Sequence, residues 1–160
     1  MLDQQAAGLK LFGVLELIKK HENEMRQVFT HSGSSIITDD QMIDLLKPIY
    51  DDNTQRKEID INTYKAMCDF VQELHHKECD LAVGDLLKFI TGVRKIPALG
   101  LPKQIAIYFI HGCDQVKCKC RPKASTCDLH LRLPVHYQTA EDMIAAWMSA
   151  LKECKGFGHL

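Results

Sequence analysis

The sequence lacks any apolar run that approaches the ~20 residues needed to cross a bilayer. Its N-terminus, MLDQQAAGLK, does not have the basic and then apolar pattern of a signal peptide. It also lacks an excess of charge of either sign, because 20 basic residues stand against 21 acidic ones for a formal net charge of -1. We therefore expect no membrane and no nucleic acid among the partners, and an intracellular location in the cytoplasm or the nucleus.

Internal repeats and low-complexity tracts are missing as well. With 46% apolar and 26% charged residues, the composition is that of an ordinary globular protein. A length of 160 residues suits one compact unit, or one unit with an appendage. The one local run of basic residues has no aromatic residues among them to stack on bases, so we interpret it as a solvated loop. This run comprises Lys117, Lys119, Arg121 and Lys123.

Helical spacing of apolar residues dominates the first part of the chain. Residues 9–29 are expected to form one or two amphipathic helices. Thr38 and Gln41 have the spacing of a capping box, and the apolar residues that follow predict a helix through Ile49, which Pro48 should kink or end. Residues 51–60 are polar without periodicity, which predicts a boundary loop.

Later segments alternate between helix and strand patterns. Asn62 and Asp80 are the expected N-caps of two further helices, and Gly92 suits the end of the second. The β-rich run at residues 105–110 predicts a buried strand, and the alternation from Leu129 to Leu133 predicts a second strand that Pro134 stops. A last helix is expected to begin after Thr139 and to run to about residue 153.

Seven cysteines, an odd number, indicate free thiols, a metal site or a catalytic residue rather than a disulfide framework in a reducing compartment. For any single cysteine, such as Cys68 on the apolar face of a helix, the simplest role is that of a small buried residue. A zinc site could draw on Cys113, Cys118, Cys120 and Cys127, with His111 nearby. The interval between Cys118 and Cys120 is too short for the usual zinc knuckle, so we expect no metal and no other cofactor.

Cys127 is the candidate nucleophile. A reactive thiol needs exposure and neighbours that favour the thiolate, such as cations, backbone N–H groups or an imidazole. Lys123 and Arg121 precede Cys127, and Ser125 and Thr126 can form hydrogen bonds in the same loop. His130 follows, but strand alternation should turn it to the opposite face, so its role as a general base is not favoured.

Three blocks of this sequence resemble HECT-type ubiquitin ligases. Pro122 to Cys127, with the Leu-x-Leu-Pro pattern at residues 131–134, is similar to the active-site signature of that family. Residues 87–92, LKFITG, resemble the end of a characteristic helix, and Pro97 and Gly100 follow as they do in the family. Phe157 matches an aromatic residue that stands fourth from the carboxyl end.

The resemblance implies an α+β fold, with a small sheet packed against helices as in a HECT C-lobe and a helical N-terminal segment before it. Residues 1–57 would correspond to the end of the N-lobe, and residues 58–160 to the C-lobe. A complete HECT domain has a longer N-lobe, which holds the conjugating enzyme, so we interpret the chain as the C-terminal part of such a domain.

The same resemblance implies a role for each site residue. Cys127 would accept ubiquitin as a thioester from a ubiquitin-conjugating enzyme and pass it to a lysine of a protein substrate. Ser125, Thr126 and Lys123 would shape the supporting loop, and Phe157 would position the lobe or the acceptor lysine. Ser125 departs from the family, which often has His at this position. The alternatives are a non-catalytic paralogue that binds ubiquitin or another ligase, and a zinc-binding interaction protein.

Overall fold

The computed structural model describes residues 2–29, 36–76, 81–97, 99–112 and 120–154, and these separate into two compact units. The helical unit comprises Met1–Ser35 with Pro97–Gly100, and the sheet unit comprises Ile36–Ile96 with Leu101–Leu160. The predicted lobe boundary after residue 57 stays a prediction, and that residue lies within a helix of the sheet unit.

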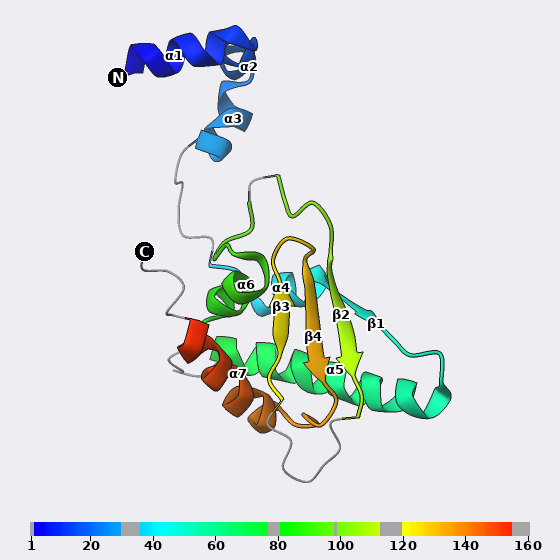
Figure 1. Ribbon diagram of the computed structural model, residues 1–160. Helices are drawn as coiled ribbons and strands as arrows, with labels where there is room; N and C mark the ends of the chain where they lie inside the picture. The colour runs from blue at the N-terminus through cyan, green and yellow to red at the C-terminus, as the bar shows by residue number, and fades with distance from the viewer. Residues whose placement is uncertain (1, 30–35, 77–80, 98, 113–119, 155–160) are drawn as a thin grey trace. The chain divides into compact units, whose positions relative to one another are not determined.

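The helical unit contains α1 (Leu2–Leu11), α2 (Val14–Lys20) and α3 (Glu22–Phe29), as Figure 1 shows. The expectation of helices over residues 9–29 is confirmed, with interruptions at Gly13 and His21. Gly13 has a φ of 67°, in the left-handed region that glycine adopts without a steric penalty. None of the described helices in either unit has the length and apolar character needed to cross a membrane.

The sheet unit opens with α4 (Asp39–Leu45) and β1 (Leu46–Ile49). The predicted capping box is confirmed, because the Gln41 N–H donates to Thr38 Oγ1 and the Thr38 N–H donates to Gln41 Oε1, each at 3.2 Å. A helix as far as Ile49 was the wrong expectation. Leu46 is already extended because β1 pairs with a strand far along the chain, and Pro48 disfavours helical backbone at Lys47, the residue just before it.

The long helix α5 (Thr54–His76) begins earlier than the sequence suggested. Asn53 Oδ1 accepts the N–H groups of Gln55 and Arg56 at 3.0 and 3.2 Å, so the helix starts after Asn53 and not after Asn62. The boundary loop predicted for residues 51–60 is therefore wrong from Thr54 onward. The first turns of α5 are mostly polar and exposed to solvent. Further along the helix, one face becomes apolar and buried.

The next helix, α6 (Val83–Thr91), ends as expected at Gly92, whose φ is 84° and whose N–H donates to the Lys88 carbonyl at 2.8 Å. Asp80, the predicted N-cap, lies outside the described residues, and Ala82 occupies the N-cap position. The last helix, α7 (Ala140–Cys154), begins at the predicted cap, where Thr139 Oγ1 accepts the N–H of Asp142 at 3.2 Å.

Four strands form one sheet in the order β1-β2-β4-β3, in which β2 is Ile105–Ile110, β3 is Lys123–Ser125 and β4 is His130–Pro134. The pairs β1/β2 and β2/β4 are parallel, and β3/β4 is an antiparallel hairpin. Both predicted strands are present. The α+β class is confirmed.

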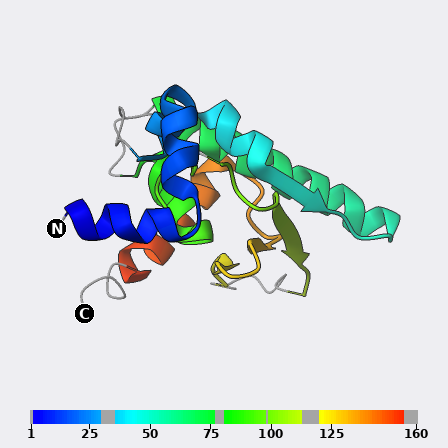
Figure 2. The same ribbon diagram turned by 90° about the horizontal axis from the view of Figure 1, so that it is seen from above.

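Helices pack on one face of this sheet. Figure 1 shows α5 behind the strands and α7 at their lower left, and the view from above in Figure 2 also places α5 to one side of the strands. Alternate strand residues point into this layer, where Ile107 and Leu131 are fully buried against Phe70 and Trp147. The core therefore supports one face of the sheet and fixes the β3/β4 hairpin at the edge of the sheet.

Candidate functional site

The candidate site is the turn of the β3/β4 hairpin. Ser125 pairs with His130, so the four residues between them close the hairpin, and Cys127 is one of these four. Thr126, Cys127 and Asp128 are all exposed. The structure thus places Cys127 where a thiol can be reached by a large partner, which is the first requirement for a nucleophile.

Leu129 anchors the turn. It is only 5% exposed, and its carbonyl accepts the Ala106 N–H at 3.0 Å, which links the turn to β2. Its φ of 43° lies in the left-handed region, which costs a residue with a side chain about 1–2 kcal/mol. The turn therefore has a strained backbone that the buried side chain holds in place.

Substitution at Leu129 separates the strain from the packing. Leu129→Ala is expected to lose about 2–4 kcal/mol of unfolding free energy, because it removes a buried side chain and keeps the strain. Leu129→Gly should be the more stable of the two variants by roughly 1 kcal/mol, since glycine accepts the positive φ. Urea denaturation measures both, and a glycine variant less stable than the alanine variant would contradict the strained conformation.

Asp128 organises a polar network beside the thiol. Its Oδ1 lies 2.7 Å from Lys103 Nζ, and its Oδ2 lies 3.0 Å from Nδ1 of His130. The His130 ring in turn meets the Tyr108 ring edge to face, with centroids 5.7 Å apart. These contacts restrict the rotation of the Asp128 side chain and link the turn to the residues that precede β2.

The same contacts predict a pH response of the turn. The hydrogen bond from Lys103, followed by that from His130, holds the pKa of Asp128 below its usual value. A depressed carboxyl pKa contributes stability above the unfolded pKa, and this contribution is lost as the pH falls through the folded pKa. Lys103→Ala should therefore raise the pKa of Asp128 toward its usual value, so that the Asp128 carboxylate is protonated at a higher pH than in the wild type.

An NMR titration of the Asp128 carboxyl carbon measures this change directly. Lys65→Ala, which removes an exposed lysine from α5, serves as the matched control and should leave the Asp128 midpoint where it is in the wild type. The same midpoint in Lys103→Ala and in the wild type would show that Lys103 does not set the acidity of this carboxyl group.

The other residues predicted for the site are placed as follows. Ser125 is half-buried at the end of β3, and Lys123 is exposed at its start. Phe157 lies outside the described residues, as do Cys113 and Cys118 of the zinc alternative. In the part of the chain that the structure describes, no three His, Cys, Asp or Glu residues gather as metal ligands would.

Cys68 and Cys120 differ from each other in their surroundings. Burial raises the pKa of the Cys68 thiol, so this residue is a poor nucleophile, as its predicted position in the core implied. Cys120 is exposed, and its carbonyl accepts a hydrogen bond from the Tyr137 hydroxyl. Cys120 is therefore the appropriate comparison for Cys127 in any test of thiol reactivity.

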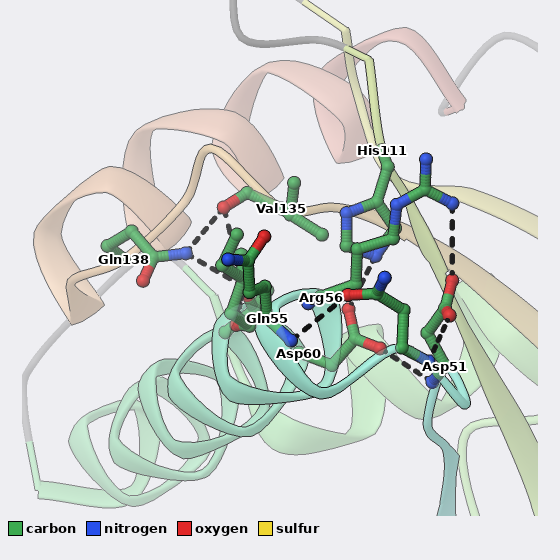
Figure 3. A network of polar contacts seen from close by, with 10 residues as sticks. Asp51, Gln55, Arg56, Asp60, His111, Val135 and Gln138 are labelled. Atoms are coloured by element: carbon green, nitrogen blue, oxygen red, sulfur yellow. Dashed lines mark hydrogen bonds and ion pairs between the residues drawn. The ribbon is translucent and has the colours of Figure 1, made fainter.

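A second polar cluster lies at the other end of the sheet (Figure 3). The Asp60 side chain is 1% exposed, and its Oδ2 accepts the Asp51 N–H at 2.9 Å. Its Oδ1 lies 2.8 Å from His111 Nε2, close enough for an ion pair with protonated His111 but without the direction of a hydrogen bond. Because His111 follows the end of β2 and Cys127 lies at the opposite end of the sheet, this cluster does not serve the thiol.

Sequence reasoning missed Lys103 and Asp128 as parts of the site. The position of Asp128 next to Cys127 was a usable signal, since an anionic side chain beside a candidate nucleophile calls for a cationic partner. Lys103 gave no signal, because the parallel pairing of β2 and β4 is what brings it to the turn.

Comparison with known families gives one match. The family model described as HECT-domain (ubiquitin-transferase) matches residues 21–160, which covers the sheet unit and the candidate turn. Comparison with curated proteins finds no match.

Proposed function

Because the chain belongs to the HECT-domain family of ubiquitin transferases, we propose that Cys127 accepts ubiquitin as a thioester and passes it to a lysine of a protein substrate. The observation that carries this proposal is the exposure of Cys127 in the turn of a hairpin that a buried residue and a polar network both hold. The implied partners are ubiquitin, a conjugating enzyme and the substrate. The site of action would then be inside the cell, in the cytoplasm or the nucleus.

The first step is an exchange of one thioester for another. The Cys127 thiolate attacks the carbonyl carbon at the ubiquitin C-terminus, the bond from that carbon to the conjugating enzyme's sulfur breaks, and this second sulfur leaves as a thiolate. Since a C–S bond forms as another breaks, the step needs no external energy source. The exposed turn suits this step, because ubiquitin and the conjugating enzyme must both approach the Cys127 sulfur atom.

The second step forms an amide. The neutral amine of a substrate lysine attacks the same carbonyl carbon, and the bond to Cys127 Sγ breaks so that the sulfur leaves as a thiolate. The nitrogen loses a proton to solvent or to this thiolate as the isopeptide forms. Thr126 and Ser125 shape the loop around the sulfur in this proposal, and Lys123 lies on the strand that leads to it. Phe157 would position the lobe or the acceptor amine.

A thioester assay tests the proposal. The protein is mixed with a ubiquitin-loaded conjugating enzyme, and in a parallel reaction with ubiquitin activated as the thioester of a small thiol, which needs no enzyme docking. We expect a ubiquitin adduct that disappears with reductant, and no such adduct on Cys127→Ala. Folded protein that forms no adduct in either reaction would overturn the transfer role and favour a non-catalytic binding module.

A further inference from the structure

The sheet has a second face that no described helix of its unit covers. Figures 1 and 2 show α5, the longest helix of the unit, on the opposite side of the strands. Five exposed side chains project from this uncovered side, which we call the open face: Lys47, Ile49, Tyr108, Lys123 and Arg132. Tyr108 is 45% exposed and Ile49 is 40% exposed, and the two side chains lie on neighbouring strands.

Strand register orders these residues into a row. Ile49 pairs with Tyr108, Tyr108 with Arg132, and Arg132 with Lys123, so one row crosses all four strands. Neighbouring strands lie about 4.8 Å apart, which brings the side chains of the row into contact range of a single extended ligand. One half of the row is apolar and the other half is cationic. Lys47 adds a third cation in the neighbouring row.

The charge of the open face has one sign. The four strands carry no Asp or Glu. Among the described residues, Lys47, Lys123 and Arg132 have no ion-pair partner. The carboxylate of the turn, Asp128, already forms an ion pair with Lys103 and a contact with the His130 ring. Three unpaired cations beside two exposed apolar side chains therefore lack a complementary surface.

We propose that the open face binds an extended acidic protein segment that carries an apolar side chain among its carboxylates. Ile49 and Tyr108 would contact the apolar side chain, because both already lie exposed and adjacent. Arg132 would donate two parallel hydrogen bonds to one carboxylate of the segment, and Lys123 and Lys47 would pair with the neighbouring carboxylates. Opposite charge over such a surface favours specificity and rapid association.

A single-stranded nucleic acid fits these residues less well. Such ligands need several aromatic rings on which bases stack in succession. Tyr108 is the one exposed aromatic residue on the described strands, and its neighbour His130 is engaged by Asp128 and by the Tyr108 ring itself. An aliphatic residue, Ile49, stands where a second stacking ring would be needed.

The inference extends the proposed function without depending on it. Lys123 begins the short strand that leads to the turn of Cys127, so a segment on the open face would bind the same hairpin that carries the thiol. Binding itself uses no thiol chemistry. Cys127→Ala should therefore bind the segment as tightly as the wild type, and a failure of ubiquitin transfer would leave the binding unchanged.

Fluorescence anisotropy with a labelled synthetic peptide tests the inference on the full chain. The peptide carries glutamates around a Leu-Phe pair, and its counterpart has lysines in place of the glutamates. We expect saturable binding of the acidic peptide alone. The double variant Lys47→Glu/Arg132→Glu should weaken it by about tenfold or more, and the uncharged change Tyr108→Ser should weaken it by roughly the same factor.

Lys65→Glu/Lys88→Glu is the matched control, since it reverses two exposed charges on α5 and α6 and should leave the affinity within about twofold. Circular dichroism confirms that each variant is folded. The inference is overturned by absence of saturable binding, by equal weakening in the control, or by a single-stranded oligouridine that binds more tightly than the acidic peptide.

Discussion

Cys127→Ser is expected to replace the reductant-sensitive ubiquitin adduct with one that survives reductant and is cleaved by hydroxide. A serine hydroxyl has almost no anionic fraction near neutral pH, whereas a thiol has a few per cent, so loading should slow by about a hundredfold or more. The ester that does form is an oxyester, which thiols do not cleave readily. Gel electrophoresis with and without reductant, on samples taken over several hours, measures both the slower loading and the changed chemistry.

Cys120→Ser is the control for this experiment. Cys120 is also exposed and lies shortly before β3, but it does not belong to the turn that Leu129 and Asp128 hold. Its variant should load ubiquitin at the wild-type rate. If Cys120→Ser, and not Cys127→Ser, changed the adduct from a thioester to an oxyester, Cys120 would be the acceptor and our proposal would be wrong.

Trp147→Ala is expected to cost about 3–5 kcal/mol of unfolding free energy, which is much of the stability of a typical domain. Trp147 on α7 is fully buried, and it is the largest side chain in the core of the sheet unit. Its ring stacks on Phe70 at 6.1 Å and meets the edge of Phe89 at 5.1 Å. Removing it opens a cavity between α5, α6 and α7 that these helices cannot fill without moving.

Trp147→Phe separates the packing of this residue from its polarity. Trp147 Nε1 is buried and has no hydrogen-bond partner among the described residues, a situation that costs about 1–3 kcal/mol. Phenylalanine removes the unpaired N–H and keeps most of the ring contacts, so Trp147→Phe should cost less than half of what Trp147→Ala costs. Chemical denaturation gives both values, and equal losses would show that the indole N–H has a partner in solution.

Local signals in the sequence were sufficient for several helix ends and for the motif that contains Cys127. The capping box at Thr38 and Gln41, the left-handed Gly92 and the cap at Thr139 each depend on residues within a few positions, so they can be recognised without the fold. The motif around Cys127 is likewise continuous, and the structure places Cys127 itself in an exposed turn between two strands.

Non-local pairing accounts for the errors. The residues of β1 have apolar spacing that a helix would share, and their strand state comes from pairing with β2 at register positions such as Leu46 and Ile105. The early start of α5 was missed for another reason, because its first turns are polar and exposed, so no apolar periodicity marks them. The positive φ of Leu129 could not be foreseen, since leucine rarely adopts it.

The parallel pairing of β1 with β2, described above, bears on how the protein is made. α5 and α6 lie between these two strands in the chain, so the sheet cannot begin to close until both helices have left the ribosome. Trp147, whose ring stacks on Phe70 of α5, is synthesised later still. Part of the apolar face of α5 therefore stays uncovered until α7 is made, and apolar surface exposed in this way favours aggregation.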